Sequence, residues 1–199
     1  MEIRYRGIIL RDMIESDIED WIRWQTLDTE WMDWDGPDLE APPFIEMEFR
    51  AECSVLLGRP ESGFRHFFEL ATADGKHIGM ITSHLTGDDF NYLTRQEIES
   101  GKKFYHTLGI VICESCNWNK GLGAQALTGF CKYLLDNGKT ELRLQTWSGN
   151  LRMVHCAQKI GFVEINRFAG NRYIRGNVYD GLTFQLDLDR FHNYLKQNT

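Results

Sequence analysis

The run Trp118-Asn119-Lys120-Gly121-Leu122-Gly123-Ala124 has the composition of a loop that binds an anion. Gly121 and Gly123 permit backbone conformations and close approaches that a side chain would obstruct. An apolar run at residues 108–112 precedes the loop and an amphipathic run follows it, so the loop should join a strand to a helix. Amides at a helix N-terminus lack intrahelical acceptors and lie at the positive end of the helix dipole. The sequence therefore predicts a ligand that carries phosphate.

The glycine spacing distinguishes this loop from two other phosphate-binding loops. A P-loop needs Gly, four residues and then Gly-Lys-Ser or Gly-Lys-Thr, an order that is absent here. A dinucleotide fingerprint needs a third small residue three positions after Gly123, where Ala126 stands, so that pattern stays open. The strands expected before the loop form an antiparallel meander rather than alternating with helices, which disfavours a nucleotide-binding oxidoreductase.

Length and composition indicate one globular domain over residues 1–199. The hydrophobic share of 42% and the aromatic share of 13% suit a packed core and argue against disorder. The net charge of −7 disfavours nonspecific binding to nucleic acid or to an anionic membrane. Because the sequence has neither a signal-peptide core nor an apolar run of about 18 residues, we expect a cytoplasmic protein.

The cysteines indicate reduced thiols rather than a disulfide framework, since five is an odd number and no secretory signal is evident. Cys113 and Cys116 form a Cys-x-x-Cys pair. A zinc site would need two further ligands at close spacing, and neither Cys131 nor Cys156 has a nearby partner. We therefore expect no metal cofactor.

Hydrophobic periodicity predicts an α+β fold with six to seven strands and several helices. Ser16 and Glu19 have the spacing of a capping box at the start of the first helix. Turns are expected at Ala73-Asp74-Gly75-Lys76 and at Ala169-Gly170-Asn171. The expected strands cover residues 4–13, 64–71, 76–85, 108–112, 141–147 and 182–188, and the expected helices cover the segment from Ser16, 44–57, 91–100, the segment from the loop to 137–138, and 150–161.

The segment around residues 21–35 combines tryptophans with carboxylates, and two interpretations of it remain open. In the first, the tryptophans attach a long connection to the core or form a subunit contact, as in a homodimer. In the second, aromatic faces and carboxylates form a pocket wall that receives a cationic amine. The substrate-binding candidates of this second interpretation are Trp31, Asp33, Trp34 and Asp35.

The order of elements and two motifs resemble the GNAT superfamily of acyl-CoA-dependent N-acyltransferases, especially the branch that includes the ribosomal-protein N-terminal acetyltransferases. Residues 118–124 are similar to the family's Gln/Arg-x-x-Gly-x-Gly/Ala loop. The second motif is Trp147-Ser148-Gly149-Asn150 with Lys159-Ile160-Gly161-Phe162. The resemblance covers nearly the whole chain. It implies a mixed, mostly antiparallel twisted sheet of six to seven strands flanked by helices, with a splayed central strand pair. It also implies transfer of an acetyl group from acetyl-CoA to a primary amine of a small-molecule or peptide acceptor.

The resemblance also implies roles for individual residues. In the family the loop binds the CoA pyrophosphate through backbone amides, and the preceding strand splays from its neighbour to pair with the pantetheine arm. Asn150 matches an asparagine near the CoA arm, although it could simply cap the helix that follows. The implied cofactor-binding residues are Ile110, Val111, Ile112, Cys113, Trp118, Asn119, Lys120, Gly121, Leu122, Gly123, Ala124 and Asn150.

Transfer to an amine requires a base, because a Lys-like ammonium with a pKa of about 10.4 is not nucleophilic near neutrality. Glu114, just after the splayed strand, is the first candidate, and His106 and His155 follow; each could instead be an ordinary surface or supporting residue. Ala157 stands where many family members have a tyrosine general acid, so the proton donor is unassigned. A noncatalytic CoA-binding or protein-interaction module is therefore the alternative function.

Overall fold

The computed structural model describes residues 1–39, 42–60 and 62–198. The chain divides into two compact units. The first contains Met1–Ile81 and Ile110–Phe130, and the second contains Thr82–Gly109 and Cys131–Thr199. Two strands and one helix contribute residues to both units, so each unit is described by itself below.

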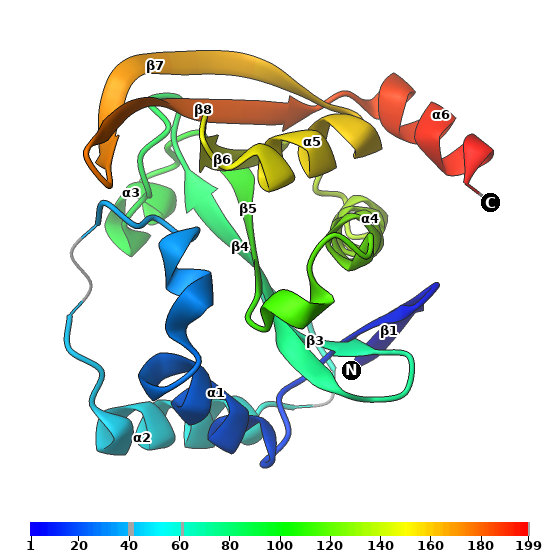
Figure 1. Cartoon of the computed structure of the whole chain (residues 1–199). Helices are drawn as coiled ribbons and strands as arrows, with labels where there is room; N and C mark the ends of the chain where they lie inside the picture. Colours follow the sequence, from blue (N-terminus) through cyan, green and yellow to red (C-terminus); the bar gives the residue numbers. More distant parts are fainter. Residues whose placement is uncertain (40–41, 61, 199) are drawn as a thin grey trace. The chain divides into compact units, whose positions relative to one another are not determined.

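The first unit contains the N-terminal segment Met1–Ile81, in which the helices α1 (Asp17–Thr26) and α2 (Glu46–Leu57) lie side by side (Figure 1). It also holds the start of a fourth strand, the end of a fifth strand and the first turns of a long helix. Its complete elements are β1 (Glu2–Tyr5), β2 (Ile8–Arg11), α1 (Asp17–Thr26), the 3-10 helix η1 (Thr29–Asp33), α2 (Glu46–Leu57), β3 (Phe67–Thr72) and the 3-10 helix η2 (Ser115–Asn117).

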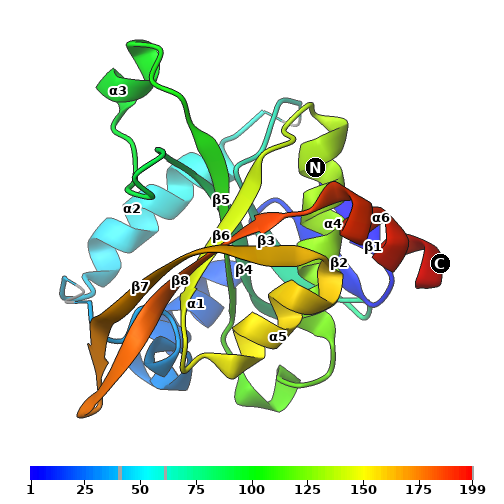
Figure 2. The ribbon, with the colours of Figure 1, turned by 90° about the horizontal axis from the view of Figure 1, so that it is seen from above.

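The second unit is dominated by a long C-terminal hairpin, whose two strands run together in Figure 2. Its complete elements are α3 (Arg95–Glu99), β6 (Leu142–Trp147), α5 (Leu151–Ile160), β7 (Phe162–Ile174), β8 (Asn177–Leu186) and α6 (Leu188–Gln197). The elements that both units share are β4 (His77–Thr86), β5 (Tyr105–Ile112) and α4 (Leu122–Asp136).

The described strands pair in the order β1-β2-β3-β4-β5-β6-β8-β7. The β1–β2, β2–β3, β6–β8 and β7–β8 pairs are antiparallel, whereas β5–β6 is parallel. This confirms the predicted mixed and mostly antiparallel sheet. The sheet has eight strands rather than six to seven, because the strand expected over residues 4–13 is a hairpin.

Two predictions at the N-terminus were wrong. Arg6 has a positive φ of 55° and precedes Gly7, so the chain reverses there and Tyr5 pairs with Ile8. The capping box does not form, since Ser16 has helical dihedrals and its side chain accepts no capping hydrogen bond. Instead, the carboxylate of Asp17 accepts a hydrogen bond from the Ile14 amide at 2.8 Å.

The C-terminal region also differs from the prediction. The turn expected at residues 169–171 is an irregularity inside β7, and the reversal occurs at Arg175 and Gly176, which have φ values of 51° and 79°. The sequence analysis missed α6, which Asp187 caps by accepting a hydrogen bond from the Arg190 amide at 3.0 Å. Its fully buried Phe191 attaches this helix to the unit.

Other predictions agree with the structure within a few residues. The Asp-Gly turn between β3 and β4 forms, with the Thr72 amide donating to the Lys76 carbonyl at 2.9 Å. Helices α2, α4 and α5 lie where periodicity placed them. Gly161 ends α5 with φ of 111°, and a Cβ there would lie 2.7 Å from the Phe191 nitrogen, which explains the glycine.

The first unit has a tryptophan-rich hydrophobic core. Trp21, Trp24 and Trp31 are at most 9% exposed, which confirms the structural interpretation for these three side chains. The buried members of this core are Met13, Ile18, Trp21, Trp24, Trp31, Cys53, Val111 and Cys113. Among the described residues, no helix has the length and apolar character needed to cross a membrane.

Candidate functional site

The loop between β5 and α4 exposes a series of backbone amides. The Trp118 amide donates to Ser115 at 3.0 Å, and the Gln125 amide donates to Gly121 at 3.1 Å. Among the described residues, the amides of 119–124 have no acceptor in a loop or turn, and those in the first turn of α4 have no intrahelical acceptor. Asn119, Lys120 and Gly121 are exposed. The loop therefore has the geometry that the prediction requires, at the N-terminus of a 15-residue helix, and its binding of an anion stays a prediction.

Two positive φ angles shape this loop. Asn119 has φ of 59°, and Asn adopts the left-handed region more readily than most residues. Gly121 has φ of 78°, which a β-branched residue would adopt only with strain. The sequence predicted the need for glycine at 121 but not the contribution of Asn119.

The strand before the loop separates from its parallel neighbour. The β5–β6 register contains His106↔Leu142, Thr107↔Arg143 and Leu108↔Leu144, and the described residues show no further pair. Both strands nevertheless continue, β5 to Ile112 and β6 to Trp147. The final residues of β5 thus lack β6 as a pairing partner, as the resemblance implied for residues 110–112.

Gly79 allows β4 to approach this end of β5 closely. A Cβ on Gly79 would lie 2.0 Å from the Val111 carbonyl oxygen, a separation that no side chain could accept. Just beyond, the Cys113 amide donates to the Ile78 carbonyl at 2.9 Å. The sequence analysis missed Gly79, although an isolated glycine within a strand pattern is a known sign of close backbone approach.

The Trp118 side chain faces back toward the strand. Its indole N–H donates to the Ile112 carbonyl at 2.7 Å, and its ring meets Trp34 edge to face, with centroids 6.5 Å apart. The position that holds Gln or Arg in many GNAT proteins is therefore used here to attach the loop to the end of β5.

The four substrate-binding candidates divide into two kinds. Trp31 is buried, and its indole N–H donates to the Trp24 carbonyl at 3.0 Å, so it supports the segment from inside. Trp34 is half-buried against Trp118, and Asp33 and Asp35 are exposed on either side of it. The last three residues thus lie at least partly at the surface, and their contact with a substrate stays a prediction.

Glu114, the first candidate base, is held between two cations. Its carboxylate forms an ion pair with Lys76 and another with Arg23, the latter at 3.1 Å. Burial alone would raise the pKa of Glu114, but the hydrogen bonds from Lys76 and Arg23 outweigh burial and lower it. A carboxylate with a lowered pKa is a weak base, so this geometry favours a structural role.

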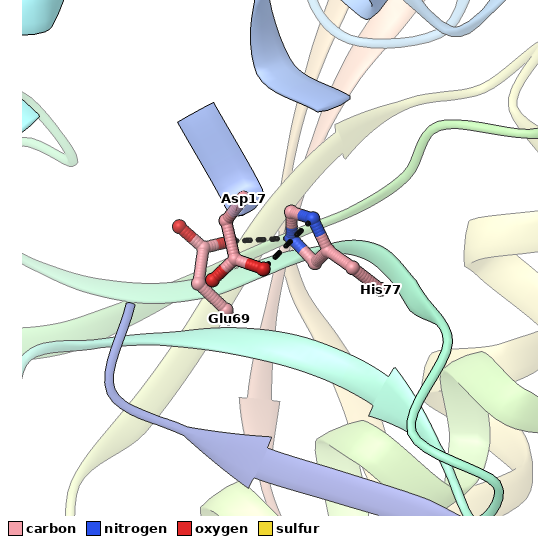
Figure 3. Close-up of side chains that lie close together, drawn as sticks. All are labelled: Asp17, Glu69 and His77. Atoms are coloured by element: carbon pink, nitrogen blue, oxygen red, sulfur yellow. Dashed lines mark hydrogen bonds and ion pairs between the residues drawn. The ribbon is translucent and has the colours of Figure 1, made fainter. Parts of the chain in front are cut away.

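A buried histidine lies among three carboxylates in the first unit, and Figure 3 shows it with two of them, Asp17 and Glu69. His77 places Nε2 2.9 Å from Glu69, and its Nδ1 lies 3.2 Å from Asp20 and 3.4 Å from Asp17. Burial alone would lower the pKa of His77, but the carboxylates of Glu69, Asp17 and Asp20 outweigh burial and raise it. This cluster connects α1 to β3 and β4, and no local pattern of residues indicated it.

Asp17, Glu69 and His77 also come close enough to hold a metal ion in geometric terms, since their ligand atoms lie within 4.8 Å of one another. The carboxylate oxygens that would bind the ion already accept hydrogen bonds from other residues. Arg11 donates to both Asp17 oxygens at 2.6 and 2.7 Å, and the Trp21 indole donates to Glu69 at 3.1 Å. A cation would have to displace these donors, so the cluster fits a buried ion-pair network better than a metal site.

The remaining predicted residues belong to the second unit. Asn150 caps α5, its side-chain oxygen accepting a hydrogen bond from the Met153 amide at 3.2 Å. His106 is buried, with Nδ1 2.9 Å from the Ser83 hydroxyl. His155 is exposed on α5, and Ala157 on the same helix is fully buried.

Comparison with protein families identifies the class of this chain. Residues 8–163 match the family described as "Acetyltransferase (GNAT) domain". The match covers well over half of the chain, so the protein belongs to the GNAT acetyltransferase family. Comparison with curated protein sequences gives no match.

Solved structures show the same fold at low sequence identity. A GNAT-family acetyltransferase from Bacillus anthracis is 15% identical with a TM-score of 0.66, over 94% of this chain and 98% of that one. RimL, a ribosomal L7/L12 α-N-protein acetyltransferase in complex with coenzyme A, is 15% identical with a TM-score of 0.66, over 93% and 97%. Spermidine N-acetyltransferase from Vibrio cholerae, in complex with CoA and spermine, is 16% identical with a TM-score of 0.65, over 94% and 99%.

Proposed function

We propose that this protein is an N-acetyltransferase that transfers an acetyl group from acetyl-CoA to a primary amine of a small-molecule or peptide acceptor. Family membership supports acetyl transfer, and acetyl-CoA is the co-substrate that the family implies. The observation that carries the proposal is the series of amides at 119–124 without a backbone acceptor, which follows, after η2, the end of β5 that does not pair with β6.

The residues present fit a molecule with a pyrophosphate and an extended amide-containing arm. The amides of 119–124 and the N-terminus of α4 would bind the pyrophosphate. The backbone of Ile110–Cys113, which does not pair with β6, would pair with the arm instead. The bound cofactor supplies the acetyl thioester, and the chain's own groups have to orient the amine and accept its proton.

The first test is binding and turnover by the wild-type protein. At about 100 times Kd, acetyl-CoA should stabilise the fold by roughly 2.7 kcal/mol, which for this chain length corresponds to a thermal midpoint about 5–10 °C higher. Release of free CoA thiol should then depend on an added amine. Absence of a midpoint shift at saturating acetyl-CoA would reject the proposal.

We infer further that the acceptor is cationic. Asp33 and Asp35 are exposed on either side of the half-buried Trp34, so two carboxylates and an aromatic ring lie together in one segment of the first unit. Two structural neighbours are a spermidine acetyltransferase with spermine bound and a ribosomal-protein acetyltransferase. Polyamines and peptide N-termini are therefore the first acceptors to assay.

The double variant Asp33→Asn, Asp35→Asn should raise KM for a polyamine acceptor about five- to thirtyfold while changing kcat less than twofold. The reason is that the carboxylates would act on the substrate's charge in both ground and transition states, which is uniform binding. Initial rates of thiol release over a range of acceptor concentrations measure both constants. Asp136→Asn, Asp189→Asn, which removes two exposed carboxylates elsewhere, is the matched control. An unchanged KM would exclude this acceptor surface.

The variant Glu114→Gln should lower kcat less than about tenfold, because the Lys76 and Arg23 ion pairs already make this carboxylate a weak base. Loss of a general base typically lowers the rate by about 10²–10⁴-fold. The pH dependence of kcat for wild type and variant distinguishes the two roles. A fall of 100-fold, together with loss of the acidic limb of the profile, would instead assign Glu114 as the base.

The second candidate function is a noncatalytic CoA-binding or interaction module. The observation in its favour is that α5 carries the fully buried Ala157 where many relatives have a tyrosine general acid. His106 and His155 remain candidate bases of the catalytic proposal. Binding of acetyl-CoA without any thiol release, across polyamine and peptide acceptors, would favour the module.

A further inference from the structure

Trp118 connects two parts of the first unit that the proposed function assigns to different substrates. Its indole N–H donates to Ile112 at the end of β5, in the segment proposed for the CoA arm. Its ring meets Trp34 edge to face, at an interplanar angle of 79°, in the segment proposed for the acceptor. Trp118 is also the first residue of the loop whose amides would bind the pyrophosphate.

The surroundings of Trp118 limit how its ring can move. The side chain is partly buried and packs against the core cluster that contains Trp21, Trp24 and Trp31. The indole N–H can only donate, and a backbone carbonyl accepts its hydrogen bond. A restraint on the backbone of the loop would therefore reach the Trp34 ring through one packed side chain.

We propose that Trp118 is a positioning residue that couples the cofactor loop to the acceptor segment, so that binding at residues 119–124 orders residues 29–35. A ligand that fixes the loop reduces the conformational freedom that the acceptor segment must still lose, and this produces positive coupling between the two sites. The inference rests on the proposed function, because it requires that coenzyme A binds at the loop.

Hydrogen–deuterium exchange with coenzyme A as the probe tests the coupling without a known acceptor. In the wild type, saturating coenzyme A should slow exchange in peptides covering 119–127 and in peptides covering 29–35. Trp118→Phe keeps an aromatic ring but removes the N–H donor. It should weaken coenzyme A binding about three- to tenfold, the loss expected for one hydrogen bond, and should abolish the response at 29–35 while retaining it at 119–127.

A second variant keeps the test decisive if Trp118→Phe does not fold. Trp34→Leu removes the edge-to-face contact but leaves the bond to Ile112, so it should abolish the response at 29–35 with less than a twofold change in coenzyme A affinity. Tyr173→Phe, at a 68% exposed position in the second unit, is the aromatic control and should behave like wild type.

The outcomes separate this inference from the proposed function. If coenzyme A does not bind the wild type and leaves 119–127 unchanged, the proposed function fails. If 119–127 responds in the wild type but 29–35 does not, or if the 29–35 response persists in Trp118→Phe or Trp34→Leu, the coupling is overturned while the cofactor site stands.

Discussion

Replacing Gly121 by valine should abolish the stabilisation of this protein by acetyl-CoA. Gly121 has φ of 78°, so a β-branched side chain would force the backbone of the loop out of its present conformation. The amides on either side would then point away from a shared anion. Losing two charge-assisted hydrogen bonds of about 1.5–3 kcal/mol each would weaken binding by at least roughly 100-fold.

The thermal midpoint with and without acetyl-CoA measures this effect, and isothermal titration gives the two dissociation constants. Gly176→Val is a closely matched control. Gly176 has φ of 79° in the β7–β8 turn, and nothing lies within 4 Å of an added Cβ, so it imposes the same backbone strain away from the loop. The control should melt lower than wild type yet keep the full acetyl-CoA response. Equal loss of response in both variants would contradict a site at the loop.

The loop, the strand before it and the helix after it could be predicted because their signals are local. Glycine placement, a β-branched run and a 3.6-residue period lie within about 30 consecutive residues, and the structure places β5 and α4 accordingly. The roles of Trp118 and Glu114 could not be predicted in the same way. Their partners, Trp34 for one and Lys76 for the other, are about 40 to 80 positions away and come into contact only in the fold.

The errors at the two ends have a similar origin. Residues 4–13 alternate enough to suggest one strand, and the reversal at Arg6 depends on a positive φ in a residue that rarely adopts it. Helix α6 has only one buried residue, Phe191. The rest of its sequence is mostly polar, so hydrophobic periodicity did not predict the helix. Residues of the buried network, Asp17, Glu69 and His77, are separated by up to 60 positions, and each alone has the sequence surroundings of a surface residue.

That network leads to the second large expected effect: His77→Leu should lower the free energy of unfolding by about 3–5 kcal/mol. Removing the histidine would leave the fully buried Glu69 without its cationic partner, whereas the 1% exposed Asp17 would keep its ion pair with Arg11. Breaking a buried ion pair by deleting one member typically has an effect of this size. For a chain of this length the thermal midpoint should fall by about 6–20 °C. His192→Leu, at an exposed position on α6, is the control and should change stability by less than about 0.5 kcal/mol.

The pH dependence of the free energy of unfolding tests the role of His77 more specifically. The pKa of His77 lies above its usual 6.5 in the folded state, because the carboxylates of Asp17, Asp20 and Glu69 outweigh the effect of burial. Between about pH 6.5 and that raised value the folded protein binds more protons than the unfolded chain, so the free energy of unfolding falls as pH rises. The stabilisation by His77 is therefore complete below about pH 6.5 and is lost as pH rises through the folded-state pKa.

Titrating groups outside the network can be kept out of this measurement by the choice of pH, whereas Glu69, whose pKa burial raises, titrates as part of the network. The carboxyls with lowered pKa, such as Asp12 and Glu114, lose their contribution only in acid, and the buried Cys113 thiol, whose pKa burial raises, contributes above about pH 9. Denaturant unfolding of wild type and His77→Leu between pH 6 and 9 should show a falling curve for the wild type and a flatter one for the variant. Parallel curves would mean that the pKa of His77 is the same in the folded and unfolded protein, and a wild-type curve that rises with pH relative to the variant would mean that His77 is neutral in the folded protein; either result would overturn the charged His77.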